Sequence, residues 1–223
     1  MKILAIDTAA NLCAACIFDM QAGELGRAMH DLGKGHAEHL MSTIDEALAA
    51  ANSAYADLGL IAVSVGPGSF TGIRVGVAAA RGLALALGIP SVGITTLDAM
   101  AAEARRKFAG KSVLAAIDAR RDQLYVASYD ASGKRSYGPA IATLEEAAGM
   151  LTADMALVGS AATMIAGQAG RDVAIAATSA TADIAIYAEL AAGMDPASGP
   201  PQPLYLRGAD AKPQQGFAVE RRD

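Results

Sequence analysis

Two aspartates that end apolar stretches are the first residues in this sequence whose positions suggest chemistry. Asp7 follows Ile3-Leu4-Ala5-Ile6, and Asp118 follows Leu114-Ala115-Ala116-Ile117. Such stretches are typical of central strands that are covered on both faces. Carboxylates at two strand ends can orient a metal ion, a water molecule or a nucleotide in one cleft. The alternative is that each aspartate only caps the turn after its strand.

A glycine-rich joint over 66–72 is the second candidate site. A predicted strand over 60–65 leads into it, and a predicted helix over 71–87 follows it. Amide groups at such a joint can hold a phosphate or a carboxylate. The P-loop pattern does not fit, because no lysine follows Gly72, and the dinucleotide fingerprint fails at Thr71. A tight turn without a ligand is the alternative. The candidate nucleotide-binding residues are Asp7, Thr8, Gly68, Ser69, Thr71 and Asp118.

Histidines and cysteines give weak signals for metal or redox chemistry. His36 and His39 lie three residues apart at the start of a predicted helix, but no third ligand is identifiable. No histidine is paired with a nucleophile motif. Cys13 and Cys16 fall in a predicted strand, where a separation of three places them on opposite faces. We therefore expect no metal site and two reduced, buried thiols.

Composition and charge limit the function classes. Of the 223 residues, 53% are apolar and 18% are charged, which supplies a core for one large domain or two small ones. No charge-free stretch reaches the roughly 18 residues of a membrane helix, and an acid at position 7 comes too early for a signal peptide. We expect a cytoplasmic protein without membrane contact. The net charge of -5 argues against direct binding of nucleic acid.

The expected elements occur in the same order twice. The stretch over 3–9 is echoed by 114–120, and Asp19 and Asp130 each precede a glycine turn at the same offset of 111 residues. This indicates two duplicated halves. The predicted domains are 1–101, joined by the C-terminal segment 180–223, and 102–179. Further strands are expected over 2–9, 12–18, 24–31, 91–95, 123–129, 134–142, 155–158 and 173–176, with helices over 36–51, 144–151 and 181–192.

The predicted helix over 71–87 is apolar on almost every side. Small residues such as Gly76 and Ala80 lie on one side, and few polar residues stand elsewhere. Such a helix is covered on more than one face, and small residues permit close helix packing. The cover is either the core of this chain or another subunit, and the sequence leaves both open.

Four motifs, in this order along the chain, together resemble the TsaB (YeaZ) family. They are Ile3-Leu4-Ala5-Ile6-Asp7-Thr8, Gly66-Pro67-Gly68-Ser69-Phe70-Thr71-Gly72-Ile73-Arg74, Ala115-Ala116-Ile117-Asp118-Ala119-Arg120 and Leu204-Tyr205-Leu206-Arg207. The family is required for placing threonylcarbamoyl on the tRNA adenosine beside the anticodon. The resemblance implies an α/β fold with two ribonuclease-H-like domains of the actin-like ATPase and sugar-kinase superfamily.

The resemblance also implies a non-catalytic subunit. Its partners are a TsaD-type transferase subunit, with which it forms a heterodimer, and a TsaE-type ATPase subunit. ATP and metal are expected in those subunits and not in this chain, and tRNA is reached only through the complex. TsaD-like relatives carry a His-x-x-x-His metal motif where this chain has Thr96 and Met100. The alternative is a nucleotide-dependent phosphotransferase or a peptidase-like enzyme of the same fold.

The family's docking surface corresponds to the helices over 36–51 and 71–87. We expect the same surface to form a homodimer when the partner is absent, because exposed apolar surface tends to pair. The candidate partner-binding residues are His36, Leu40, Ile44, Thr71, Gly72, Arg74, Val75, Gly76, Ala79, Ala80 and Leu83.

Overall fold

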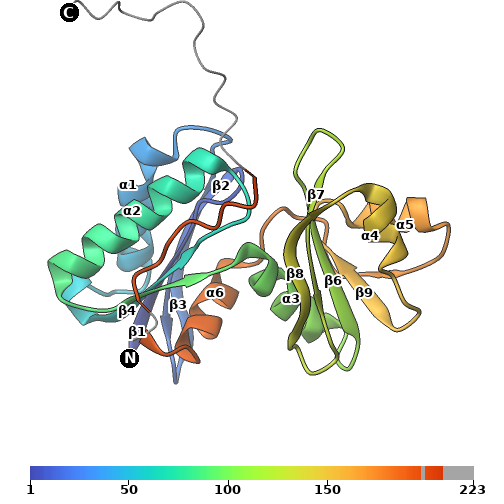
Figure 1. Cartoon of the computed structure of the whole chain (residues 1–223). Coiled ribbons are helices and arrows are strands. Elements are labelled where there is room, and N and C mark those ends of the chain that lie inside the picture. The colour runs from blue at the N-terminus through green and yellow to red at the C-terminus, as the bar shows by residue number, and fades with distance from the viewer. Residues whose placement is uncertain (197–198, 208–223) are drawn as a thin grey trace, which may run out of the picture.

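A computed structural model describes residues 1–196 and 199–207 and contains two five-stranded sheets side by side (Figure 1). In the first sheet, β1, β2 and β3 are antiparallel, and β4 and β5 run parallel to β1. The register pairs Lys2 with Asp19 and Asp7 with Ala14 across β1 and β2. The strands are β1 (Lys2–Asp7), β2 (Leu12–Asp19), β3 (Gly23–Asp31), β4 (Leu58–Ser64) and β5 (Ser91–Ile94), in the spatial order β3-β2-β1-β4-β5.

The second sheet repeats this arrangement strand for strand. Its order is β10-β9-β6-β7-β8, with β6, β7 and β8 antiparallel and β9 and β10 parallel to β6. The predicted duplication and the predicted fold class, two ribonuclease-H-like α/β units, are therefore confirmed. The strands are β6 (Ser112–Asp118), β7 (Leu124–Tyr129), β8 (Arg135–Ala142), β9 (Met155–Val158) and β10 (Ala174–Ile175).

Helices cover both faces of the first sheet. On one face, Leu4 and Ile6 of β1 pack with Ile44 of α1 (His36–Ala50) and Val77 of α2 (Phe70–Leu87). On the other face lie α3 (Thr96–Lys107) and α6 (Ile184–Ala192), whose apolar residues share one core with β1 and β6. Figure 1 shows α3 and α6 between the two sheets. Thus these two helices join the halves. The remaining helices are η1 (Tyr55–Asp57), α4 (Leu144–Gly149) and α5 (Ala162–Ala169).

The sequence patterns did not indicate α3 or α5. The predicted division between 101 and 102 falls inside α3, which continues to Lys107 and contacts β6 and β7. Its apolar face turns toward a core that both halves share, so no break in apolar pattern marks its start. α6 contacts β1 and β2, whereas residues 208–223 lie outside the described part of the chain. The division into domains stays a prediction.

Both cysteines are buried, free thiols on opposite faces of β2, as predicted. Cys13 lies in the cluster beneath α1 and α2, and Cys16 lies in the core that α3 and α6 share. Burial raises the pKa of both thiols, and that of Cys16 to about 12. A thiol that stays protonated at neutral pH is a poor nucleophile. We assign both residues to the core.

Helix α2 passes a test for membrane helices by length and composition alone. Its 18 residues have a mean hydropathy of 1.4, and a third of them are buried. A core helix of a soluble protein passes the same test. Within residues 1–196 and 199–207 it is the single helix that does so. The buried side of α2 contacts the first sheet. That contact explains the apolar residues on the buried side but not those on the exposed side.

Candidate functional site

A cleft of about 360 Å³ lies between the two halves, where the glycine joint faces the end of β6. Gly68 and Ser69 line it from the first half, and Asp118 and Arg120 line it from the second. Three of the predicted nucleotide-site residues therefore meet in one place. The other three do not line this cleft, because Asp7 and Thr8 are buried behind it and Thr71 is exposed at the start of α2.

Asp7 and Asp118 do not form a matched pair of free carboxylates. Asp7 is buried, and one of its oxygens accepts the Ala9 amide at 2.9 Å. Asp118 is exposed and accepts the Arg120 amide at 2.7 Å in the same way. Each aspartate thus stabilises the turn that follows it by accepting a hydrogen bond from the amide two residues later, which is a common role for aspartate in turns. The capping interpretation accounts for both bonds, and only Asp118 faces the cleft.

The glycines of the joint bring α2 into contact with the end of β1. A methyl group at Gly68 would lie 2.2 Å from the Ala9 carbonyl oxygen, and one at Gly72 would lie 2.0 Å from that of Thr8. At Gly76 it would lie 2.4 Å from the Thr8 hydroxyl. No side chain larger than hydrogen fits at these distances. Close backbone packing therefore explains the glycine spacing without a bound phosphate.

Hydrogen bonds within the chain already use several groups of the joint. The Ser69 amide donates to the Ala9 carbonyl at 2.7 Å, and the Gly72 amide donates to the Ser69 hydroxyl at 3.2 Å. The Thr8 hydroxyl donates to the Gly72 carbonyl at 2.7 Å. A phosphate needs free donors at such a position, and these amides do not supply them. The joint is built as a structural clamp between β1 and α2.

The turn between β6 and β7 borders the cleft and has an uncommon backbone. Arg120, Arg121 and Asp122 have φ angles of 60°, 56° and 57°, three successive residues in the left-handed region. The Arg207 guanidinium, from the fourth motif, donates to the carbonyls of Ala119 at 3.3 Å and Arg120 at 3.4 Å. It also donates to the side chain of Gln123. The C-terminal motif thereby fixes one wall of the cleft.

We expect Asp7→Asn to raise the free energy of unfolding at neutral pH. Burial raises the pKa of Asp7, and hydrogen bonds from Ser64 and Ala9 offset this only in part. The folded protein therefore holds a proton that the unfolded chain releases above its ordinary pKa of about 4. Wild-type stability consequently falls as pH rises from about 4 through the raised folded pKa.

Asparagine keeps an oxygen for the Ala9 amide and does not ionise. The gain in stability should be largest at pH 7 and vanish below about pH 4, where aspartate is also neutral. Urea titrations of both proteins at the two pH values would measure this. An equal gain at both pH values would show that ionisation of Asp7 is not the cause.

The outer sides of α1 and α2 form an exposed surface, which we call the helical face. α2 contributes Arg74, Ala78, Arg81 and Leu85, and Leu85 is 86% exposed. α1 contributes the exposed residues Glu38, Met41, Asp45 and Glu46. Figure 1 shows the two helices next to each other on the outside of the first sheet. The face has exposed apolar residues, Met41 and Leu85, with basic groups on α2 and acidic groups on α1.

Several predicted partner-binding residues are buried and do not lie on this face, so their role in partner binding stays a prediction. They pack inward against the first sheet. The inward residues are His36, Leu40, Ile44, Gly72, Gly76 and Ala80. Exposed or half-buried positions are Thr71, Arg74, Val75, Ala79 and Leu83.

An aromatic and cationic cluster extends the helical face. The Arg74 guanidinium lies 3.7 Å from the Phe70 ring centre and donates to the Tyr205 hydroxyl at 2.7 Å. The rings of Phe70 and Tyr205 are 5.3 Å apart, and both are exposed. Sequence reasoning did not single out Phe70, Tyr205 or Leu85. Phe70 and Tyr205 stand in two of the four motifs, and no other sequence feature pointed to a role for them.

The histidines show no metal site. The His36 ring nitrogen lies 3.2 Å from the Leu12 carbonyl oxygen, and the side chain is buried, whereas His39 is exposed. In the part of the chain that the structure describes, no group of three or more histidine, cysteine, aspartate or glutamate side chains could hold a metal ion. The buried His36 therefore fits a role in fixing α1 to β2.

Sequence comparisons give named relatives. The family model described as TsaD, tRNA N6-adenosine threonylcarbamoyltransferase, matches residues 30–198. The tRNA threonylcarbamoyladenosine biosynthesis protein TsaB of Escherichia coli is 37% identical over 129 residues, 58% of this chain and 55% of that protein. The TsaB of Buchnera aphidicola subsp. Schizaphis graminum is 35% identical over 57% and 60% of the two chains. The match thus spans little more than half of these relatives. An uncharacterized Mycobacterium tuberculosis protein is 35% identical over 95% of this chain and 94% of its own length.

Solved structures agree with the sequence relatives. YeaZ from Pseudomonas aeruginosa has a TM-score of 0.71 at 26% identity, covering 86% of this chain and 92% of its own. A second Pseudomonas aeruginosa structure, described as an uncharacterized protein with similarity to peptidase YEAZ, has a TM-score of 0.77 at 26% identity, covering 92% and 99%. The ethanolamine utilization protein EutJ from Carboxydothermus hydrogenoformans, 12% identical with a TM-score of 0.53, shares the fold alone. By sequence and by structure, this chain belongs to the TsaB (YeaZ) family.

Proposed function

We propose that this chain is a non-catalytic subunit for threonylcarbamoyl modification of the adenosine next to the anticodon in tRNA. It acts by binding a TsaD-type transferase subunit through the helical face. The observation that carries this proposal is the set of exposed apolar residues on that face, with Leu85 of α2 at 86% and Met41 of α1 at 44% exposure. Large apolar side chains exposed together mark protein interaction sites. The names of the curated relatives supply the pathway.

The composition of the cleft supports an accessory role. Among residues 1–196 and 199–207, Arg120 is the single cation that lines it, and the Ser69 and Gly72 amides are already used. A triphosphate is bound by several cations and free amides. We therefore assign ATP and metal to the partner subunits, the TsaD-type transferase and a TsaE-type ATPase. tRNA contact is assigned to the complex, because this chain carries a net charge of -5.

A homodimer through the helical face is part of the same proposal. The acidic side of α1 and the basic side of α2 are complementary, so a two-fold axis would place each against the other. In this view the homodimer and the heterodimer compete for one surface. Adding the TsaD-type partner should convert the homodimer to the heterodimer in sedimentation experiments.

Reconstitution tests the proposed function. The TsaD-type and TsaE-type subunits, a threonylcarbamoyl donor and tRNA are incubated with and without this chain, and modified adenosine is measured by mass spectrometry. We expect modification only when this chain is present, and none from this chain alone. Full modification without this chain, or modification by this chain alone, would contradict the proposal.

A phosphotransferase is the second candidate, and the cleft is the observation that favours it. Ser69 and Asp118 face each other across a hollow large enough for a small ligand. Calorimetry with ATP and magnesium on the isolated chain separates the two candidates. Tight binding with turnover would favour the enzyme, and the absence of heat at millimolar ATP would favour the subunit.

A further inference from the structure

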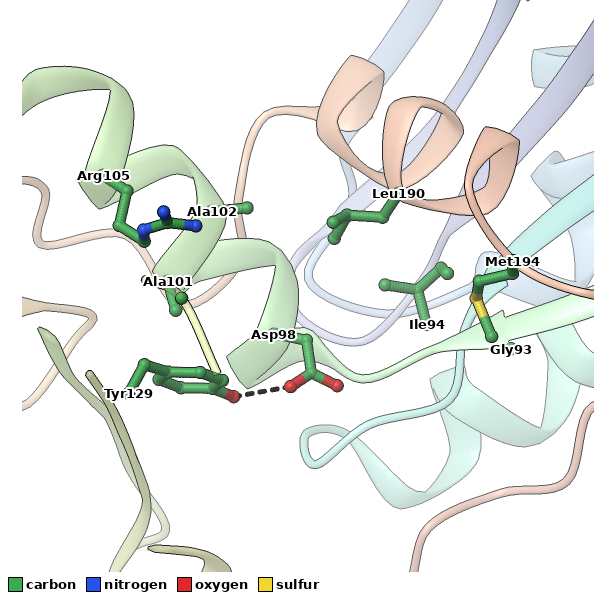
Figure 2. Close-up of a pocket in the computed structure, with 10 residues that line it drawn as sticks. Gly93, Ile94, Asp98, Ala101, Ala102, Arg105, Tyr129, Leu190 and Met194 are labelled. Carbon is green, nitrogen blue, oxygen red and sulfur yellow. Dashed lines mark hydrogen bonds between the residues drawn. The ribbon is translucent and has the colours of Figure 1, made fainter. Parts of the chain in front are cut away.

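A second pocket, which shares no lining residue with the cleft beside the glycine joint, is not used by the proposed function. It has a volume of about 280 Å³ and lies between α3, β5, β7 and α6. Figure 2 shows Arg105, Asp98 and Tyr129 on one side of it and Ile94, Leu190 and Met194 on the other. One wall is therefore polar and the opposite wall is apolar. An engineered cavity of about 150 Å³ holds benzene, so this volume suits a ring or a short chain with a polar end.

Asp98 is fully satisfied by its neighbours. It accepts the Tyr129 hydroxyl at 2.7 Å and the Thr95 hydroxyl at 2.6 Å. Arg135 Nη1 lies 3.3 Å from Asp98 Oδ1 and neutralises the charge of the carboxylate. A carboxylate with these donors and a cation beside it has little left to offer a ligand. Asp98 therefore serves to fix Tyr129 and the first turn of α3 at the edge of the pocket.

Arg105 is the unsatisfied group of the pocket. Among the residues that the structure describes, its buried Nε atom has no hydrogen-bond partner, and its Nη2 atom donates a long hydrogen bond to the Ala131 carbonyl at 3.5 Å. No carboxylate among residues 1–196 and 199–207 pairs with it. Gly133, with a φ of 88°, leaves the space that the guanidinium occupies, because a methyl there would lie 1.9 Å from Nη1. A partly buried cation with a buried free donor favours an anion.

We propose that this pocket binds a small amphipathic carboxylate. The carboxylate accepts hydrogen bonds from the Arg105 guanidinium, and the apolar body packs against Ile94, Leu190 and Met194. The charges at the pocket favour this ligand class. Asp98 and Arg105 are the charged residues of the lining, and Asp98 is paired with Arg135, which lies outside the lining. Arg105 is then the charge left to balance, and a carboxylate supplies one negative charge. A phosphate monoester carries close to two negative charges, so one of them would have no positive charge to balance it.

An occupant would contact both halves of the protein. α6 packs on the first sheet, and β7 belongs to the second. A ligand held between Leu190 of α6 and Arg105 of α3 would therefore stabilise the arrangement of the two halves in which both walls are in place. This inference does not depend on the proposed role in tRNA modification.

Methyl NMR on the full chain tests the site with 3-phenylpropanoate as the probe and 3-phenylpropanol as its neutral match. Labelled methionine methyls are recorded, and the Met194 signal is identified by Met194→Leu. We expect saturable shifts of the Met194 methyl with the acid, and affinity for the alcohol lower by about tenfold or more, because a hydrogen bond to a charged group is lost. Equal affinity for both compounds, or no shift up to about 10 mM acid, would overturn the proposal.

Two variants separate the site from general binding. Arg105→Gln should weaken the acid about tenfold or more, whereas the matched control Arg106→Gln should not, because Arg106 is exposed and pairs with Glu189. Met194→Glu places a carboxylate at the rim of the pocket and should abolish binding even if Arg105→Gln fails to fold. Because this variant lacks the Met194 methyl, its binding is measured by titration calorimetry beside the wild type. Unchanged binding in Met194→Glu, or in a folded Arg105→Gln, would show that the acid binds elsewhere.

Discussion

Leu85→Asp is expected to abolish binding of the TsaD-type partner while the fold stays intact. Leu85 is 86% exposed, so the free subunit loses almost no packing when it is replaced. In the proposed complex, the aspartate would be buried against the partner, where an unpaired charge is strongly unfavourable. Truncating a central interface residue commonly costs about 2–4 kcal/mol, roughly 30-fold to 1,000-fold in Kd. Titration calorimetry with the purified partner measures it, and homodimer formation should be lost in parallel.

Met164→Asp is the matched control. Met164 is 46% exposed on α5, on the half of the molecule that does not carry the helical face. It should bind the partner as the wild type does. Charged substitutions at Gly76 or Ala80 would not serve as tests, because both residues are buried against the first sheet. Wild-type affinity in a folded Leu85→Asp protein would show that the partner docks elsewhere.

Gly72→Ala is expected to lower the free energy of unfolding by about 3 kcal/mol or more. The added methyl would lie 2.0 Å from the Thr8 carbonyl oxygen, so α2 and the end of β1 must move apart. That movement also strains the bond from the Thr8 hydroxyl to the Gly72 carbonyl. Overpacking against rigid backbone costs about 1–3 kcal/mol and occasionally more. Urea-induced unfolding, followed by circular dichroism, would measure the change.

Gly82→Ala in the same helix is the control for helix propensity. A methyl at Gly82 meets no atom within 4 Å, so only the backbone effect remains. Alanine in a helix interior is more stable than glycine by about 0.5–1 kcal/mol, so this variant should be slightly stabilised. If both alanine variants changed stability in the same direction and by similar amounts, close packing at Gly72 would not be the reason for the glycine.

The family motifs and the duplicated order of elements were readable from the sequence. Apolar strands that end at Asp7 and Asp118 repeat at one offset, and the two sheets have the same strand order. Periodicity located α1 because one side of it packs on a sheet. Such a signal identifies the buried side of a helix and carries no information about its exposed side. Leu40 and Ile44 are regular because they are buried, whereas an exposed residue such as Leu85 follows no pattern set by the core.

The tertiary structure alone decided what the conspicuous residues do. The sequence determined the repeated order of elements and the two buried thiols through local patterns, and its four motifs determined the family, whose resemblance implied the fold. It did not determine that Gly68 and Gly72 face the backbone at Thr8 and Ala9, or that Tyr205 stacks beside Phe70, 135 positions earlier. Nor did it determine that the buried Nε atom of Arg105 finds no hydrogen-bond partner in the described part of the chain. Such contacts join residues far apart in sequence, and they arise only when the chain folds and brings α2, α3 and the C-terminal segment against their neighbours.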